Sequence, residues 1–282
     1  MFNLAESFVN HCITPTFFEL SGNMMSNTSK HFVGFVFLGY MTNDDRSEGI
    51  QINKYISNSG FCSRREAEKL IEQARVTVNN ELVLLSARVF PGDEVAIDGE
   101  RIKNKQRPIY IALNKPVGVT STTDLSDKTN IISFMNHPKR IFPVGRLDKD
   151  SEGLILLTND GDIVNKILRA GNNNEKEYIV TVDKELTGEM IRQMGTGVNI
   201  IGERTKPCYI KQEAARRFRI ILKQGLNRQI RRMCSELGYK VKTLKRIRIM
   251  HITLGNLASG KWRYLTQPEI VQLEKTLSNA SN

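Results

Sequence analysis

A short segment near the middle of the chain places charged side chains between two glycines. Arg146 and Asp148 are separated by one leucine, and Gly145 and Gly153 flank them. Glycine allows a tight turn and a close approach of the backbone to a ligand, and a carboxylate such as Asp148 can act as a nucleophile or take a proton. The acidic run over residues 148–152 could also hold a metal ion, but it lacks the rest of a calcium-binding loop. The spacing alone fits a charged surface turn equally well.

A second segment is strongly basic. Residues 214–250 contain twelve Lys and Arg and a single acid, Glu236. Like charges crowded in this way repel one another unless an anion neutralises them, which favours contact with a phosphate backbone over a solvated surface. The same segment predicts a helix that has Asn227 as its N-cap, runs through Leu237 and stops at Gly238.

The elements that must position these residues are expected to be strands and one short helix. Apolar runs bounded by turn residues predict strands at 109–113, 154–158, 176–182 and 220–222, and an amphipathic pattern predicts a helix at 131–135. The first strand ends in a turn that contains Lys115, Pro and Gly. Tyr178 lies in the third strand, where an aromatic residue is also an ordinary strand former.

Residues 50–107 have the pattern of a separate small module. Apolar spacing predicts two helices, the second with Ser63 as N-cap and Glu66 at the capping-box position. Short strands are predicted at 76–78 and 83–85 around a turn formed by Asn79 and Asn80, and a third strand is predicted at 95–97 after another turn at 91–93.

Basic residues at the helices of this module could share one surface. Residues 50–106 carry nine Lys and Arg against eight Asp and Glu, so the module is nearly neutral. Lys54 lies in the first helix, and Arg64 and Arg65 start the second. A helix N-terminus with guanidinium groups can bind phosphate, but a solvated helix start fits the pattern equally well.

The composition of the whole chain limits the class of protein. It has 282 residues, of which 40% are hydrophobic and 25% charged, as in an ordinary globular protein. A net charge of +11 indicates a polyanionic partner, nucleic acid before a membrane. Four cysteines without a C-x-x-C pair and four scattered histidines indicate neither a disulfide framework nor a zinc site. We therefore expect no metal and a location in the reducing cytoplasm.

The first 48 residues differ from the rest. They hold two basic and five acidic side chains, and their apolar run at 32–41 is too short to span a bilayer. The run also lacks the pattern of a secretory signal. We expect residues 1–48 to be an extension, or the product of a start assigned upstream of a true start at Met41.

Residues 52–80 (INKYISNSGFCSRREAEKLIEQARVTVNN) resemble the S4 RNA-binding domain. Lys54, Ser63, Arg64 and their apolar neighbours occupy the positions of that pattern. Ala74 and Asn80 replace its usual glycines. Asparagine tolerates a left-handed conformation, whereas we expect Ala74 to end its helix in another way.

The later segments resemble the RNA pseudouridine synthases of the branch with an N-terminal S4 domain, the RsuA branch. The runs LNKPVG, GRLD with DSEGLILLTNDG, KEY and GLNRQIRR occur in the order typical of that family, within residues 108–273. Arg228 stands where relatives often have histidine. The resemblance implies an α+β fold, in which a small S4 domain precedes a mixed, mostly antiparallel sheet. We expect an extension at 1–48, an S4 domain at 49–107, a catalytic domain at 108–273 and a tail at 274–282.

The resemblance also implies roles for individual residues. Asp148 would be the catalyst, Arg231 the cation held against it, and Tyr178 the ring that stacks on the base. Arg146 would fill the space left by a flipped uridine. Contacts with RNA are implied for seven basic residues: Lys54, Arg64, Arg65, Lys115, Arg146, Arg228 and Arg232.

The implied reaction converts uridine to pseudouridine, which needs no cofactor because nothing is oxidised and no group is transferred. The implied substrate is 23S rRNA or a precursor of the large ribosomal subunit, with tRNA as a further candidate, and the enzyme is expected to be a monomer without membrane contact. The competing class is a non-catalytic S4-domain RNA-binding or ribosome-assembly factor. The set of Asp148, Tyr178 and Arg231 argues against it, because binding an RNA backbone does not require a buried acid. A glycoside hydrolase would need two carboxylates around a sugar and has no use for S4.

Overall fold

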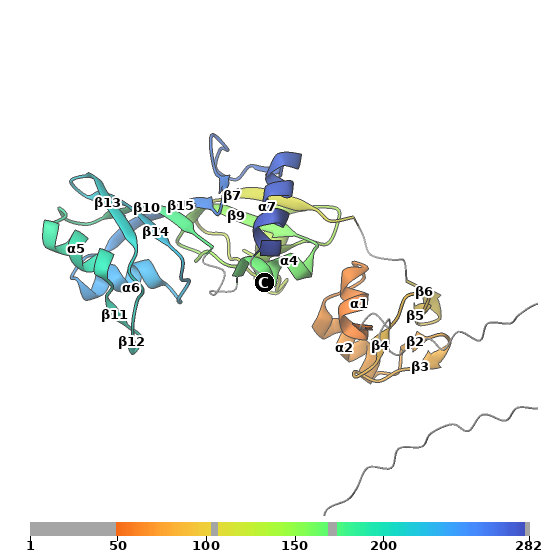
Figure 1. Cartoon of the computed structure of the whole chain (residues 1–282). Coiled ribbons are helices and arrows are strands. Elements are labelled where there is room, and N and C mark those ends of the chain that lie inside the picture. The colour runs from red at the N-terminus through yellow and green to blue at the C-terminus, as the bar shows by residue number, and fades with distance from the viewer. Residues whose placement is uncertain (1–48, 103–106, 169–173, 280–282) are drawn as a thin grey trace, which may run out of the picture. The chain divides into compact units, whose positions relative to one another are not determined.

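The computed structural model describes residues 49–102, 107–168 and 174–279 (Figure 1). The described residues all belong to one of the units into which the chain divides, Ser47–Asn282. The expectations for residues 1–48, including a start at Met41, lie outside the described residues. In the described part, no helix combines the length and the apolar character that crossing a membrane requires.

The module predicted at 49–107 contains two helices and six short strands. Its helices are α1 (Ile52–Asn58) and α2 (Arg64–Glu72). One sheet has the order β3-β2-β5-β6, and β1 pairs separately with β4. Apolar side chains of both helices and of β2, β4 and β5 form the core of this module. The strands are β1 (Ile50–Gln51), β2 (Val76–Val78), β3 (Glu81–Leu82), β4 (Arg88–Val89), β5 (Val95–Ile97) and β6 (Glu100–Arg101).

The strand predicted at 83–85 is wrong. β3 ends at Leu82, and the next three residues belong to no strand. Asn79 and Asn80 both have positive φ (52° and 69°), so they form the predicted tight turn, after which two residues pair with β2. Val83 packs against the core of the module, but Leu84 is 77% exposed and Leu85 is also exposed, so most of the apolar run that suggested a strand is not buried.

α2 has well-defined caps at both ends. The Glu66 N–H donates to Ser63 Oγ (3.2 Å), and the Ser63 N–H donates to the Glu66 carboxylate (2.7 Å), which confirms the predicted capping box. At the other end Ala74 has φ +55°. The N–H groups of Ala74 and Arg75 donate to carbonyls of the last turn (2.9 and 3.0 Å). The expectation for Ala74 is therefore wrong, because it adopts the left-handed conformation that glycine usually provides.

The remainder of the described chain is built on a nine-stranded sheet. Its order is β13-β14-β10-β15-β9-β7-β17, while β8 pairs with β9 and β16 with β15. All its neighbouring strands are antiparallel except β9 and β15. This confirms the predicted α+β fold with a mixed, mostly antiparallel sheet. The strands are β7 (Tyr110–Lys115), β8 (Phe142–Val144), β9 (Glu152–Thr158), β10 (Lys176–Val182), β13 (Tyr209–Ala214), β14 (Arg217–Leu222), β15 (Val241–Ile249), β16 (Ile252–Thr253) and β17 (Trp262–Tyr264), with a separate hairpin of β11 (Asn199–Ile200) and β12 (Glu203–Arg204).

Helices cover the sheet on both faces. α4 and α7 pack against one face of β7 and β9 (Figure 1). α3 packs against the opposite face of the same strands. α5 and α6 pack against β10, β14 and β15. These helices are α3 (Ile131–Met135), α4 (Gly161–Leu168), α5 (Gly188–Thr196), α6 (Gln229–Glu236) and α7 (Gln267–Asn279).

The last helix crosses the domain boundary expected at residue 273. α7 continues to Asn279, and Leu273 and Leu277 are both buried in the core that it shares with β7, β9 and α4. We therefore extend the second part of the chain to residue 279.

The two halves of the large sheet meet at a short parallel contact between β9 and β15, which we call the seam. Two register pairs define it, Lys245 with Glu152 and Arg246 with Gly153. Gly153 has φ +106°, and a Cβ there would lie 2.2 Å from the Arg246 carbonyl oxygen. The two strands can approach this closely because residue 153 has no side chain.

Candidate active site

Asp148 lies in the loop 145–151, which connects β8 to β9 at the seam. The buried Ser121 hydroxyl donates to the Leu147 carbonyl (2.8 Å) and accepts from the Leu147 N–H (3.2 Å). The Ser151 N–H donates to the Asp148 carbonyl (3.0 Å). These bonds hold the backbone on both sides of the catalytic candidate.

Two arginines from the start of α6 reach this loop. Arg228 Nη1 lies 3.4 Å and Arg231 Nε lies 3.9 Å from the same oxygen, Asp148 Oδ2. Arg228 also donates two hydrogen bonds to the Asp150 carboxylate (3.2 and 3.1 Å). Arg231 Nη2 donates to the Asp150 carbonyl (2.8 Å) and to Ser151 Oγ (3.0 Å). Arg231 therefore lies beside Asp148 without a hydrogen bond to it, and its own bonds go to the backbone and side chain that follow.

The two loop carboxylates meet these cations differently. Burial opposes ionisation of Asp150, but hydrogen bonds from Arg228 and the charge of Arg231 outweigh it, so the pKa of Asp150 is lowered. Asp148 keeps 33% of its side chain exposed. Arg231 Nε is buried and has no hydrogen-bond partner among the described residues. A partly open carboxylate beside two cations is an arrangement suited to attack on a sugar carbon or to removal of a proton.

The RNA contact predicted for Lys115 is wrong. Its side chain is 0% exposed, and Nζ donates to the carbonyls of Pro116 and Val119 (both 2.8 Å). Burial lowers the pKa of this ammonium to about 8, although the charges of Asp148 and Asp150 oppose the fall. Lys115 is thus an internal cation near the catalytic loop, and its charge is not available to RNA.

Tyr178 lies in a row of residues that crosses the seam. It is in register with Arg246 of β15, which in turn is in register with Gly153 of β9. Residues paired in this way project from the same face of a sheet. Tyr178 is half-buried and packs against the apolar cores on both sides of the seam. It therefore lies on the sheet face that carries the Asp148 loop.

Two further arginines belong to this region. Arg146 is exposed in the loop, as a side chain that enters an RNA helix must be. Arg246 is buried, and its Nε donates to the Leu154 carbonyl (2.6 Å) while Nη1 donates to the Arg146 carbonyl (3.5 Å). Arg246 thus ties β15 to β9 and to the catalytic loop.

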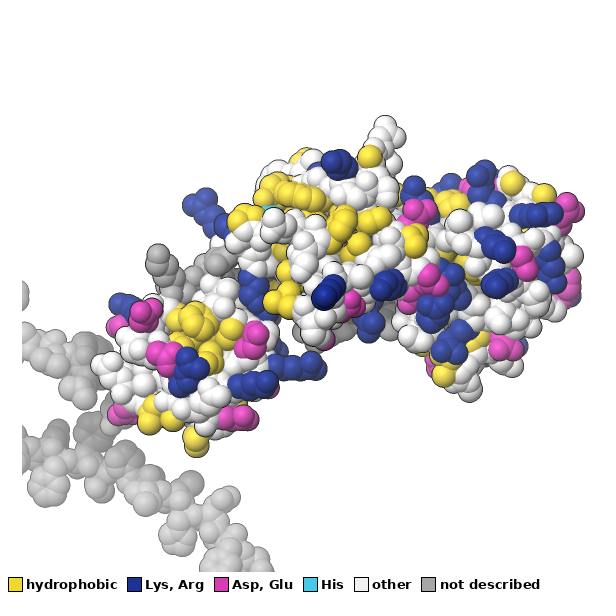
Figure 2. Space-filling model, turned by 180° about the vertical axis from the view of Figure 1, so that it is seen from behind, with side chains coloured by type: hydrophobic (Ala, Val, Ile, Leu, Met, Phe, Trp, Pro, Cys, Tyr) yellow, Lys and Arg dark blue, Asp and Glu magenta, His cyan; other side chains and the backbone are white. Residues whose placement is uncertain are grey.

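The basic stretch 214–250 carries less free charge than its sequence suggests. Arg219 and Arg248 both pair with the buried carboxylate of Glu177, and each also pairs with a second acid. Two more arginines bind the loop carboxylates. All these acids lie outside the stretch, so counting residues within it overstates the charge left for phosphate. Figure 2 accordingly shows Asp and Glu among the Lys and Arg side chains on the part of the molecule that holds β13 and β14.

The predicted start of α6 is wrong by one residue. The N-cap is Arg228, with φ +51°, rather than Asn227. The carbonyl and side-chain oxygens of Asn227 instead accept hydrogen bonds from Arg232 (3.1 and 3.2 Å). Arg232 is nevertheless exposed. Gly238 follows the helix with φ +76°, as the sequence predicts for its end.

The basic residues singled out in the small module lie on its two helices. Lys54 is in α1, and Arg64 and Arg65 are the first two residues of α2, both exposed. Arg64 Nη2 donates to Gln51 Oε1 (3.2 Å) and Asn53 Oδ1 (3.4 Å). Arg64 therefore also links the starts of the two helices.

Three residues that shape the site were not identified as such from the sequence: Ser121, Ser151 and Arg246. Their partners are 26, 80 and 92 residues away along the chain, so local spacing gives no sign of them. Ser151 does fall in the DSEG run that resembles the family motif, which was the one available signal.

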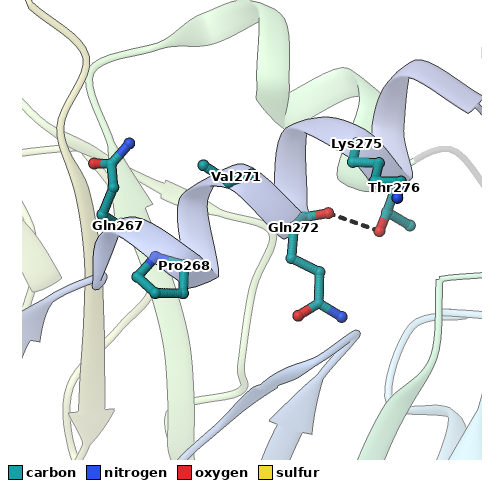
Figure 3. A pocket seen from close by; sticks show the side chains of 6 residues that line it. All are labelled: Gln267, Pro268, Val271, Gln272, Lys275 and Thr276. Atoms are coloured by element: carbon teal, nitrogen blue, oxygen red, sulfur yellow. Dashed lines mark hydrogen bonds between the residues drawn. The ribbon is translucent and has the colours of Figure 1, made fainter.

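Other candidate features of the described chain do not contribute to this site. A pocket on α7 (Figure 3) contains none of the residues discussed above. In the described ranges, no three His, Cys, Asp or Glu side chains gather as metal ligands would, and Cys62, Cys208 and Cys234 are free thiols. The pocket is lined by Gln267, Pro268, Val271, Gln272, Lys275 and Thr276.

Comparison with known proteins identifies both parts of the chain. The RNA pseudouridylate synthase family profile matches residues 109–236, and the S4 domain profile matches residues 52–95. The dual-specificity RNA pseudouridine synthase RluF of Escherichia coli (strain K12) is 54% identical over 235 residues, which cover 83% of this chain and 81% of that protein. The ribosomal large subunit pseudouridine synthase B of Bacillus subtilis (strain 168) is 32% identical over 241 residues, covering 82% and 98%.

A solved structure supports the same assignment. A crystal structure of a pseudouridylate synthase, 30% identical, matches with a TM-score of 0.59 and covers 79% of this chain and 99% of its own. The motif runs, such as GLNRQIRRMC, resemble those of ribosomal large subunit pseudouridine synthase F, which is RluF. The 54% identity to RluF confirms this likeness. Nothing in these matches supports a non-catalytic binding factor. The chain belongs to the RNA pseudouridine synthase family, in the branch with an N-terminal S4 domain, and is an enzyme that isomerises uridine in RNA.

Proposed function

We propose that this synthase acts on 23S rRNA of the large ribosomal subunit or on a precursor of that subunit, as a monomer in the cytoplasm. Two named relatives support the substrate class, since one is a large-subunit enzyme and the other is called dual-specificity. The second name makes tRNA the next substrate to test. The exposed Arg65 and Arg232 supply cations for RNA phosphates.

The reaction rearranges bonds within one nucleotide. The bond between C1′ of the ribose and N1 of the base breaks, the base turns, and a bond forms between C1′ and C5. The proton on C5 leaves and N1 acquires a proton, so atoms and charge balance without a redox partner. The enzyme must therefore stabilise an electron-poor C1′ and remove one proton.

Asp148 is the group that we assign to this chemistry. Its partly exposed carboxylate, with Arg228 and Arg231 both within 4 Å of Oδ2, is the observation that carries the assignment. The arginines place two positive charges beside the carboxylate. Tyr178 lies on the same sheet face and offers an aromatic ring to the base, and Arg146 occupies the loop surface where a flipped uridine leaves a gap.

The assignment is tested by substituting each loop carboxylate in turn. Asp148→Asn should lower tritium release from RNA labelled at uridine C5 to less than about one hundredth of the wild-type rate, since a general base alone contributes roughly 10²–10⁴. Asp150→Asn is the matched control: it removes a charge two residues away and should cost far less, because Asp150 only holds the arginines. The assignment is wrong if the two variants lose activity equally or if Asp148→Asn remains above that threshold.

The substrate is tested in cells. Carbodiimide treatment followed by primer extension on 23S rRNA and tRNA, from cells with and without the gene, maps the pseudouridines that depend on the enzyme. We expect at least one gene-dependent stop in 23S rRNA. Stops that occur only in tRNA would contradict the rRNA assignment while leaving the isomerase activity intact.

A further inference from the structure

Three aromatic rings meet at the edge of the large sheet, outside the candidate active site. We call His137, Trp262 and Tyr264 the edge patch. Their ring centroids lie 5.3–6.3 Å apart in edge-to-face arrangements. His137 Nε2 is 3.1 Å from the Tyr264 hydroxyl, and the Lys139 N–H donates to His137 Nδ1 (3.2 Å). His137 is therefore hydrogen-bonded through both ring nitrogens, and the Trp262 ring contacts the other two rings.

These rings are unusually open to solvent for their size. Trp262 is 38% and Tyr264 53% exposed. Both belong to β17, which is the last strand at its end of the described sheet. Large aromatic side chains displayed on an edge strand invite unwanted association, so proteins commonly cover or charge such edges. We therefore consider this exposed aromatic cluster on an edge strand to be a binding surface.

The edge patch lies on the same sheet face as the catalytic loop. Trp262 is in register with Leu113 of β7, which is in register with Ile155 of β9. Leu113 and Ile155 share a core with Leu147, the residue before Asp148. Two strand spacings and a shift of two residues place the Trp262 backbone about 12 Å from that of Gly153. That span corresponds to about four stacked nucleotides at about 3.4 Å each.

The charges around the edge patch suit a phosphate backbone. Lys139, two residues after His137, and Lys261, directly before Trp262, are both exposed. Arg263 lies between the two aromatic residues of β17 in sequence, so it projects from the opposite face of the strand, where it donates two hydrogen bonds of 2.7 Å to Glu269. Two exposed lysines thus adjoin the aromatic residues in sequence, and Arg263 and Glu269 neutralise each other on the other face.

We propose that the edge patch binds an unpaired base of the RNA substrate, a few nucleotides from the target uridine, by stacking it on Tyr264 beside Trp262. Every base has a π-face that can stack on an aromatic side chain, so this contact adds affinity without strict sequence preference. Lys139 and Lys261 contact the adjoining phosphates. The inference rests on the proposed function, because it takes the RNA bound at Asp148 as its ligand, and it adds a positioning site that none of the motif residues supplies.

Trp262 is the only tryptophan of the chain, so its fluorescence reports directly on the edge patch of the unmodified enzyme. We expect emission to fall, and acrylamide quenching to weaken, when a substrate hairpin with unpaired flanking nucleotides is added. A hairpin trimmed to its paired stem should bind without this change. An unchanged Trp262 signal, while filter binding shows that the flanked RNA is bound, overturns the proposal and points to a protein at this surface.

Variants separate this site from the chemistry. Tyr264→Leu should weaken binding of the flanked RNA about 5- to 150-fold and leave the single-turnover rate at saturating RNA unchanged. Tyr209→Leu is the matched control, because Tyr209 is also 53% exposed but lies in β13, at the opposite end of the sheet. Equal effects of the two variants, or none for Tyr264→Leu, refute the proposal. If the wild-type enzyme does not turn over the RNA at all, the proposed function is refuted instead. The fluorescence result does not depend on turnover, so the two failures can be distinguished.

Discussion

Replacing Gly153 by alanine should damage both the fold and the rate, because the site is assembled across the seam. Asp148 comes from the β9 side, whereas Arg228 and Arg231 come from the side of β10, β14 and β15. The new Cβ would lie 2.2 Å from the Arg246 carbonyl oxygen, and ordinary contact begins near 3.4 Å. The strands must therefore separate by about 1 Å, and a misplacement of that size can cost about 10²-fold in rate.

The effect on stability has two sources. Alanine at φ +106° adds backbone strain of about 1–3 kcal/mol, and the forced separation adds about 1–3 kcal/mol, as overpacking does. We expect the free energy of unfolding to fall by about 2–6 kcal/mol, measured by denaturant titration. The rate is measured as single-turnover tritium release at saturating RNA, at a temperature where the variant is folded.

Two glycines serve as controls for Gly153→Ala. Gly197 has φ +103° and a Cβ there would lie 2.3 Å from the Thr205 carbonyl oxygen, so Gly197→Ala reproduces strain and clash away from the seam. Gly92 has φ +97° with nothing within 4 Å, so Gly92→Ala reproduces strain alone. Both should keep the saturated rate of the folded enzyme. If Gly153→Ala reacts as fast as Gly197→Ala once folded, the seam does not position the catalytic groups.

Three further predictions concern single contacts. Ala74→Gly should stabilise the protein by about 0.5–1 kcal/mol in urea titration, because alanine at φ +55° is strained and glycine is not; unchanged or lower stability would contradict the observed helix end. Glu269→Gln should destabilise the protein at neutral pH, and the difference should disappear as pH falls from 4.5 towards 2, because hydrogen bonds from its arginine partner lower the Glu269 pKa to about 2; a difference that does not vary with pH would rule out this ion pair as the cause. Arg231→Ala should lower the saturated rate with little loss of RNA affinity, whereas joint replacement of Arg64 and Arg65 by alanine should weaken binding and flatten the salt slope by up to about 1.8. Filter binding and single-turnover release distinguish these cases, and an Arg231 variant that only binds more weakly would remove its catalytic assignment.

Local signals in the sequence were sufficient for much of the fold. The helix at 131–135 and the strand at 176–182 occur with the predicted bounds, because hydrophobic period and flanking turn residues act over a few positions. The capping box of Ser63 and Glu66 is equally local. The order of family motifs indicated the catalytic loop and the helix that faces it.

The remaining features depend on partners that are distant in sequence. Burial of Lys115 follows from carbonyls folded around it, and an exposed turn with the same residues would look identical in sequence. Two arginines of the basic stretch pair with Glu177, which lies outside the counted segment, so part of the counted charge is neutralised. Ala74 is a different case, because here the local signal is misleading. Alanine disfavours the left-handed conformation, but the packing of α2 in its module overrides that preference.

The seam also affects when the enzyme can assemble during its synthesis. Its paired strands, at Glu152 and Lys245, are separated by about 90 residues, which a ribosome adds in about 5–18 s at 5–20 residues per second. Through that interval β7, β8 and β9 can already pair with one another, so Gly153 has Lys115 of β7 on one side, while the side of Glu152 and Gly153 that will face β15 has no strand beside it. The exposed edge is only two residues long, too short to recruit a foreign strand efficiently. In the nascent enzyme this edge of β9 can thus stay unpaired until β15 has been synthesised, with little risk of pairing with a foreign strand.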